Sequence, residues 1–213
     1  MKYLNPLIVL LVYNISHAQY AQRDWEDRDQ WMPLEALFEM AKLQEGMDVA
    51  DIGCHEGYLS FHLANLLGDQ GTVYAVDVRA DRLKTLQQKA DKDGVDNINT
   101  ILGTYSSPQL TEGVLDIIFI VDTYHEIGDY VIYLTNLKDY LKPGGRLVIL
   151  EKLKTEHVGK PRQQQAFGHT LAMEYVVAEL QEAGYKIVDR RHDMGHWERN
   201  EEKIIWTVVA EVR

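Results

Sequence analysis

Two aspartates each close an apolar run in the first half of the chain, and glycines surround the first of them. Asp51 is followed by Gly53 and Gly57, and a helical pattern starts at Tyr58. Glycine lets the backbone approach a ligand closely, and a helix start presents N–H groups that no helical carbonyl accepts. Asp77 follows the next apolar run, where a carboxylate can accept hydrogen bonds from both hydroxyls of a ribose. The pattern predicts a nucleoside-binding site at the ends of two strands.

The charges in the glycine turn distinguish two classes of nucleoside ligand. Dinucleotide folds use G-x-G-x-x-G to rest a pyrophosphate on a helix start. Here His55 stands where that pattern needs a glycine, and Asp51 and Glu56 bring negative charge that suits a pyrophosphate poorly. A ligand with a cationic amino-acid end fits better, because Asp51 can bind an ammonium group directly or through water.

A further polar group follows the apolar run 115–121 and comprises Asp122, Tyr124, His125 and Glu126. Strand ends in an open α/β sheet face the ligand crevice. We expect His125 to accept a proton or to orient the reacting group, because an unperturbed histidine titrates near neutral pH. Tyr124 and Glu126 are the other catalytic candidates. The alternative interpretation is that His125 and Glu126 cap the next helix or simply line the site.

The same side chains raise the question of a metal ion. The oxygen and imidazole groups of Asp122, His125, Glu126 and Glu151 would suit Mg²⁺ or Mn²⁺. Their spacing lacks a close pair of carboxylates, so we predict that the site binds no metal. His169 could also point inward, although its position just before a helix favours a loop or helix-start residue.

Hydrophobic periodicity predicts the elements that position these side chains. Short strands alternate with helices along the sequence, the strands at 47–52, 72–78, 97–102, 115–121 and 146–150, the helices at 33–43, 58–67, 80–93, 129–141 and 172–183. This alternation implies right-handed crossovers and a parallel sheet. The last two strands, 185–191 and 203–212, have no helix between them and should form an antiparallel hairpin. We therefore expect an α/β fold with an open, doubly wound, mainly parallel seven-stranded sheet of Rossmann-like type. The polar stretch 151–169 is predicted to be a mobile crossing loop.

The order of these motifs resembles that of class I S-adenosylmethionine (SAM)-dependent methyltransferases over most of the chain after Trp31. VADIGCHEGYLS at 49–60 is similar to the first family motif, and DIIFIVDTYHEIG at 116–128 is similar to the fourth. LKPGGRLVILE at 141–151 resembles the turn and strand that follow the fourth helix. DRDQW at 27–31 is similar to a segment of small exported methyltransferases. The resemblance implies SAM as cofactor and methyl transfer as activity.

The resemblance also implies which residues hold the cofactor. Many members carry an acid after the third strand that holds adenine, but Leu102–Tyr105 contains none, so Thr104 or backbone groups would serve instead. The expected cofactor-binding residues are Asp51, Gly53, His55, Gly57, Tyr58, Asp77, Val78, Thr104 and Asp122.

Composition limits the class of partner. The formal net charge is −11 and no basic run occurs, which disfavours a nucleic-acid partner. With no added domain for a macromolecule, we expect a small-molecule methyl acceptor. Cys54 is the single cysteine, so the chain has neither an intrachain disulfide nor the multi-cysteine thiolate site of arsenite methyltransferases. The sequence does not predict an oligomeric state.

The first residues have the layout of an export signal. Lys2 precedes an apolar run over 7–15, and Ser16-His17-Ala18 offers small residues for signal peptidase. The run is too short to span a bilayer as a stable helix. We predict a signal peptide at 1–18, a cap segment and helix at 19–45 and a SAM-binding domain at 46–213. The mature protein would be periplasmic or secreted, or cytoplasmic if the signal is not used.

Two other function classes stay open from the sequence. A non-catalytic SAM-binding or sensor domain would be consistent with His55, with Thr104, and with export away from the cytoplasm where SAM is made. An NAD-dependent oxidoreductase is disfavoured, because the glycine pattern is wrong and the terminal hairpin is unexplained.

Overall fold

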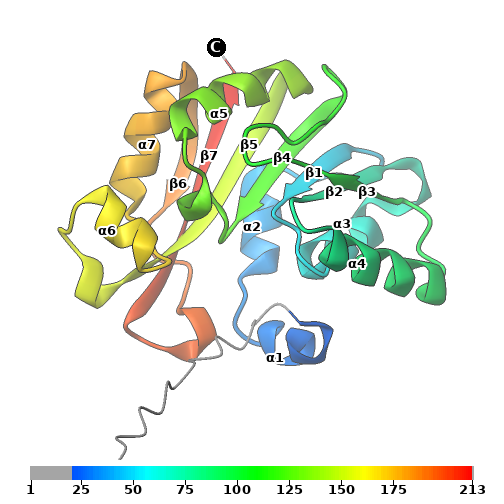
Figure 1. Ribbon diagram of the computed structural model, residues 1–213, viewed down its shortest axis with the longest axis horizontal. Coiled ribbons are helices and arrows are strands. Elements are labelled where there is room, and N and C mark those ends of the chain that lie inside the picture. Colours follow the sequence, from blue (N-terminus) through cyan, green and yellow to red (C-terminus); the bar gives the residue numbers. More distant parts are fainter. Residues whose placement is uncertain (1–20, 213) are drawn as a thin grey trace, which may run out of the picture.

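A computed structural model describes residues 21–212, and its centre is a seven-stranded sheet in the order β3-β2-β1-β4-β5-β7-β6 (Figure 1). The strands β1 to β5 are parallel, and β7 runs antiparallel to both β5 and β6. The expected fold class and the terminal hairpin are therefore confirmed. The strands are β1 (Asp48–Ile52), β2 (Thr72–Asp77), β3 (Ile98–Leu102), β4 (Leu115–Val121), β5 (Leu141–Lys154), β6 (Tyr185–Arg191) and β7 (Lys203–Val212).

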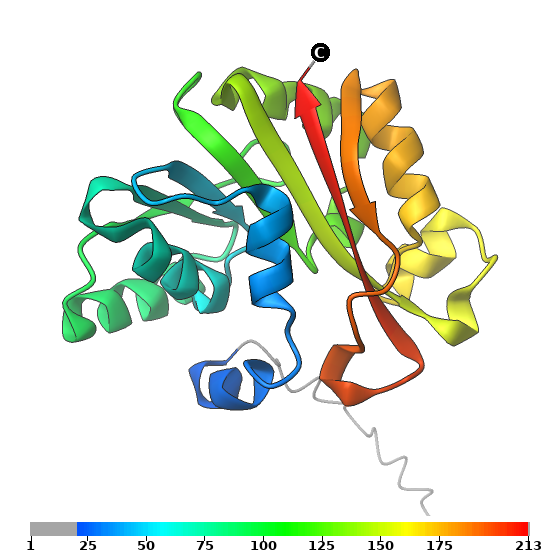
Figure 2. The ribbon, with the colours of Figure 1, turned by 180° about the vertical axis from the view of Figure 1, so that it is seen from behind.

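Helices cover both faces of the sheet. On one face α2, α3 and α4 contribute Leu37, Leu63 and Leu86 to a cluster that includes Val49 of β1. The neighbouring strand residues point the other way, toward a second cluster under α5 and α7. Figure 2 shows α2 lying against the back of the sheet. The helices are α1 (Trp25–Arg28), α2 (Leu34–Ala41), α3 (Tyr58–Leu67), α4 (Ala80–Asp93), α5 (Tyr130–Leu137), α6 (Arg162–Phe167) and α7 (Met173–Glu182).

The strand order creates one crevice. The chain moves outward from β1 to β3 and then returns to β4 on the other side of β1. Crossover helices diverge at such a switch point, so the carboxyl ends of β1 and β4 border an open space where α/β proteins bind ligands. Short 3-10 turns complete the described chain at η1 (Gln22–Asp24), η2 (Gly68–Gln70), η3 (Tyr124–Glu126), η4 (Lys138–Tyr140), η5 (Thr155–His157) and η6 (Trp197–Arg199).

The prediction of a mobile loop over 151–169 is wrong. β5 continues to Lys154, which pairs in register with Lys203 of β7, and α6 follows. The buried Gln165 explains how this polar stretch is ordered. Its side-chain amide donates to the carbonyls of His157 and Lys160 at 3.1 and 2.9 Å, and its side-chain oxygen accepts the N–H of Ala172 at 2.7 Å. The Gln165 side chain thereby forms hydrogen bonds with backbone groups that would pair with other backbone groups in a helix or strand.

Other element boundaries differ less. The helix expected over 33–43 ends at Ala41, because Lys42 adopts a left-handed conformation with φ of 56°. The helix expected over 129–141 ends at Leu137 and passes into η4. The predicted signal peptide at 1–18 lies outside the described residues, and the division at 45/46 stays a prediction. Within 21–212, no helix is both long enough and apolar enough to cross a membrane.

Candidate functional site

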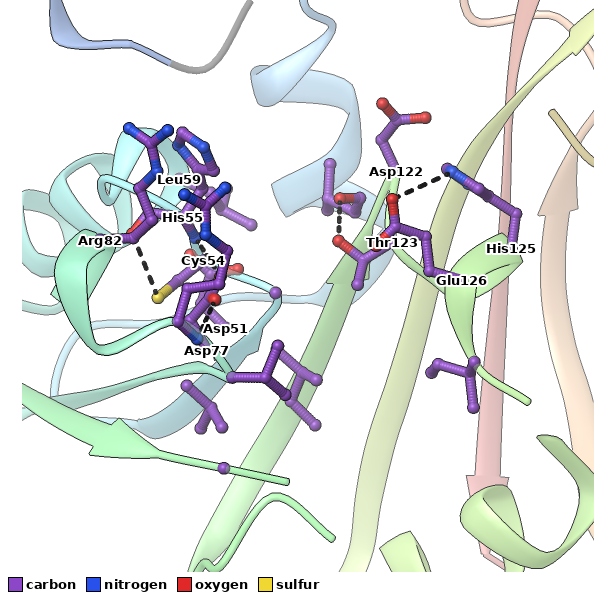
Figure 3. Close-up of a pocket in the computed structure, with 18 of the residues that line it drawn as sticks. Asp51, Cys54, His55, Leu59, Asp77, Arg82, Asp122, Thr123, His125 and Glu126 are labelled. Carbon is purple, nitrogen blue, oxygen red and sulfur yellow. Dashed lines mark hydrogen bonds and ion pairs between the residues drawn. The ribbon is translucent and has the colours of Figure 1, made fainter. Parts of the chain in front are cut away.

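A cavity of about 630 Å³ opens at the carboxyl ends of β1, β2 and β4. Figure 3 shows two groups of side chains around it. Asp51 comes from β1, His55 from the glycine turn and Asp77 from β2, while Asp122 and His125 follow β4. The structure therefore brings the predicted nucleoside site and the predicted proton-transfer group into one space.

Asp51 is a buried acid at the base of this cavity. Its Oδ2 accepts a hydrogen bond from Ser60 Oγ at 2.7 Å, and Ser60 lies in the first turn of α3. Burial raises the pKa of Asp51 to about 6, although the Ser60 hydrogen bond and the charge of Arg28 oppose the rise. A cationic ligand group at this point would stabilise the charged carboxylate.

Asp77 ties the glycine turn to the end of β2. One carboxylate oxygen accepts the N–H of His55 at 2.9 Å, and the other accepts the N–H of Arg79 at 2.8 Å. Each ionised oxygen has a second lone pair. Asp77 can therefore accept further hydrogen bonds from a ligand that enters the cavity.

The turn between β1 and α3 needs glycine at Gly53. Its φ is 82°, and a Cβ built there would lie 2.3 Å from Thr123 Oγ1 at the tip of β4. His55 reaches φ 51° with a side chain, a conformation that histidine adopts more readily than most residues. The missing middle glycine thus does not prevent the turn.

Gly57 and Tyr58 act at the start of α3. Gly57 has φ 94°, and a Cβ there would lie 2.7 Å from Leu86 Cγ. Gly57 is not part of the cavity wall, whereas Tyr58 is. Gly57 therefore serves the packing of α3 against α4, and its expected role in cofactor binding stays a prediction.

The part of the cavity beyond Asp77 is lined by the residues that we expect near adenine. Val78, Gly103, Thr104 and Tyr105 line the cavity beyond Asp77. The Thr104 hydroxyl is used within its own turn, where it donates to the Ser107 carbonyl at 3.2 Å and accepts the Ser107 N–H at 3.0 Å.

Both the backbone and the ring of His125 contact Glu151. The His125 N–H donates to Glu151 Oε1 at 3.0 Å, and the ring Nδ1 lies 2.9 Å from the same oxygen. Burial lowers the pKa of His125, but the charge and hydrogen bonds of Glu151 outweigh it, so the net pKa is raised. Because Nδ1 is occupied, Nε2 is the ring nitrogen that can meet a ligand.

Glu126 and His169 lie at the mouth of the cavity beside His125. Glu126 Oε1 is 3.8 Å from both His125 Nε2 and His169 Nδ1. The rings of His125 and His169 meet edge to face with centroids 5.4 Å apart. His169 lies in the loop between α6 and α7, as its position in the sequence favoured, and this loop places it at the site.

Tyr124 does not face the cavity. Its ring is fully buried, and its hydroxyl donates to Glu179 Oε2 at 2.8 Å on α7. Arg162 Nε of α6 binds the other oxygen of Glu179 at 2.6 Å. The prediction that Tyr124 takes part in catalysis is therefore corrected, because this hydroxyl fastens η3 to the helices behind it.

Asp122 is buried in an ion pair with Lys152 Nζ. Lys152 lines the cavity, and its Nζ lies 4.5 Å from the ring centroid of Trp197. Lys152 was not predicted as a site residue, because it lies beyond the strand predicted over 146–150. No alternation along β5 marks this lysine, because residues 147–152 are all buried.

Two sets of donors within the described residues could hold a metal ion, and both include His125. The sets are His125–Glu126–His169 and Asp122–His125–Glu151, each with donor atoms within 4.8 Å of one another. In the second set Lys152 and the His125–Glu151 hydrogen bonds already use the donors. The expectation of a metal-free site stays a prediction.

Comparison with known proteins gives one family. A model described as a methyltransferase domain matches residues 43–192. The ubiquinone/menaquinone biosynthesis C-methyltransferase UbiE of Shewanella sediminis is 32% identical over 120 residues, covering 56% of this chain and 48% of that protein. The chain thus spans about half the length of the curated relatives it matches.

Solved structures share the fold over most of the chain. The crystal structure of a SAM-dependent methyltransferase from Aquifex aeolicus is 25% identical, with a TM-score of 0.73 over 88% of this chain and 93% of the other. The [4+2]-cyclase SpnF is similar at TM-score 0.72 with 16% identity, covering 87% of this chain and 81% of that one. The second likeness shows the fold alone.

Proposed function

The chain belongs to the methyltransferase-domain family, and from that premise we propose that it transfers a methyl group from SAM to a small-molecule acceptor. The observation that carries the proposal is the shared cavity of Asp51, Asp77 and His125. The first two provide carboxylates for a cationic adenosine ligand, and the third provides a nitrogen base.

The residues present fit the cofactor. Asp51 would bind the ammonium of the methionine moiety, Asp77 the ribose hydroxyls, and the stretch around Thr104 the adenine. When bound, SAM supplies a methyl group that is already activated on a sulfonium. The protein then has mainly to position the acceptor and to remove its proton.

His125 is suited to that second task. The Glu151 carboxylate receives the Nδ1–H and leaves Nε2 to accept a proton from an acceptor hydroxyl, amine or acidic carbon. The same carboxylate stabilises the imidazolium that results. Glu126 and His169 border the position the acceptor would take.

Size and charge support a small acceptor. The cavity volume of about 630 Å³ lies in the range of small-molecule sites. The net charge of −11 disfavours nucleic acid. A screen of pooled metabolite extracts can identify the acceptor.

The experiment combines calorimetry with a transfer assay. Wild-type protein should bind SAM and its demethylated product, S-adenosylhomocysteine, and should transfer a labelled methyl group to a component of pooled metabolite extracts. His125→Gln should bind S-adenosylhomocysteine as wild type does but transfer about 10²–10⁴-fold more slowly. Absence of binding to both ligands contradicts the cofactor assignment. Binding without transfer to any component favours a sensor on the same scaffold.

We also propose that residues 1–18 direct export and are removed. The charged start, apolar run and small residues before position 19 support this. Fractionation followed by N-terminal sequencing tests it: a mature chain that starts at Gln19 outside the cytoplasm is expected. Recovery of intact Met1 in the cytosol contradicts it.

A further inference from the structure

The segment Asp27–Trp31 is fixed to the domain at both of its aspartates. Asp27 Oδ1 accepts a hydrogen bond from Arg199 Nη2 at 2.5 Å, and Arg199 lies in η6, in the loop before β7. Asp29 Oδ1 accepts the hydroxyl hydrogen of Tyr58 at 2.8 Å, at the start of α3. The two aspartates therefore hold Arg28 between the β6–β7 loop and the helix that follows the glycine turn.

The tryptophan of this segment adds a third attachment. Trp31 packs against the fully buried Trp197 with ring centroids 4.8 Å apart. Arg28 is only 4% exposed and yet lines the cavity. Its guanidinium carbon lies 4.2 Å from the Tyr58 centroid and 5.4 Å from that of Trp197. These rings attract the guanidinium through their π faces and hold it at the cavity wall.

Arg28 and Asp51 form a pair of opposite charges in one cavity. Both line it, and the charge of Arg28 lowers the pKa of Asp51 against the effect of burial. A cation and an anion that line one cavity match an α-amino acid group, whose carboxylate and ammonium are joined through one carbon.

We infer that Arg28 binds the carboxylate of the methionine moiety while Asp51 binds its ammonium. The guanidinium suits a carboxylate because it can donate two parallel N–H hydrogen bonds. In this arrangement D-R-D-x-W is a cofactor-specificity element, in which Asp27, Asp29 and Trp31 position Arg28. The inference rests on the proposed SAM site and adds a residue to it.

The test compares SAM with decarboxylated SAM, which lacks only the carboxylate. Calorimetry on wild-type protein should give tighter binding of SAM by on the order of ten- to hundredfold, as expected for a charged hydrogen-bonded pair. In Arg28→Met this ratio should fall toward one while decarboxylated SAM still binds, which also shows that the variant is folded. Arg28→Lys should give an intermediate ratio.

Arg79→Met is the matched control. Arg79 lines the same cavity at the Asp77 end, and its side chain forms an exposed ion pair with Asp81 at 3.0 Å. This variant should keep the wild-type ratio. An unchanged ratio in Arg28→Met, or an equal loss of both ligands, overturns the assignment of Arg28. Failure of wild-type protein to bind either ligand instead overturns the proposed cofactor.

Discussion

Glu151 Oε1 receives two hydrogen bonds from His125, one from the backbone N–H at 3.0 Å and one from ring Nδ1 at 2.9 Å. The contact joins the end of β4 to β5 and fixes both the ring orientation and the nitrogen left for chemistry. It also couples catalysis to pH, because the negative charge of Glu151 favours the imidazolium.

The first prediction concerns the pH dependence of methyl transfer. Since the pKa of His125 is raised, the base form appears only above the ordinary histidine range, so the rate should increase with pH and its acid limb should lie above 6.5. Glu151→Gln removes the charge and should move that limb to lower pH by about one pH unit or more. A pH profile of kcat measures both. A limb that stays in place in Glu151→Gln contradicts the pairing.

A second prediction concerns the stability of the unliganded protein. The pKa of Asp51 is raised from 3.8 to about 6, so above pH 6 the fold holds an ionised, buried carboxylate at a cost on the order of 3 kcal/mol. Asp51→Asn should therefore unfold at higher denaturant than wild type at pH 8, and the difference should shrink as the pH falls through 6 and vanish below pH 3.8, where both states are protonated. The same variant should lose SAM affinity. A stability difference that does not change with pH contradicts the assigned cause.

The close approach of Gly53 to Thr123 gives a third prediction. Gly53→Ala adds a Cβ to a left-handed residue with Thr123 Oγ1 at 2.3 Å, so unfolding free energy should fall by about 2 kcal/mol or more. Gly94→Ala is the control, because Gly94 has φ 69° with nothing within 4 Å. Gly94→Ala should lose about 1 kcal/mol of unfolding free energy, which is the cost of placing alanine in a left-handed backbone conformation. Chemical denaturation compares the two variants. Equal losses of unfolding free energy would contradict the predicted clash, because they would mean that Thr123 moves aside at no cost.

The position of Tyr124 behind the cavity leads to a fourth prediction. Tyr124→Phe removes the hydrogen bond to Glu179 and should destabilise the fold by about 1 kcal/mol. The rate of methyl transfer should be unchanged, because the hydroxyl does not reach the cavity. Chemical denaturation and the methyl-transfer assay on the same protein preparation measure the two effects. A large fall in kcat with an intact fold would restore Tyr124 as a catalytic residue.

The sheet and the site residues that directly follow its strands could be predicted from the sequence, because both depend on local sequence patterns. Apolar strands such as Leu115–Val121 are continuous, and turn residues mark their ends. Parallel strands share a carboxyl edge, so side chains that follow them converge without further information. This rule, together with the glycine turn after Asp51, led to Asp51, Asp77 and His125.

What the sequence did not predict depends on contacts between distant segments. Arg28 reaches the cavity because its neighbours bind residues near position 199, and no local pattern reports such packing. Tyr124 turned out to point away because consecutive residues of a 3-10 turn face different directions. The polar stretch after residue 150 was mistaken for a loop, since its order comes from β7 and from Gln165.

The most direct measurement is calorimetric titration of S-adenosylhomocysteine into wild-type protein, Asp77→Asn and Asp81→Asn. Asp81 is an exposed acid on the next helix and controls for the loss of one charge. We predict that wild type and Asp81→Asn bind alike and that Asp77→Asn binds on the order of ten- to hundredfold more weakly. No binding to wild type, or equal binding by all three proteins, would contradict a cavity in which Asp77 holds the ribose of SAM.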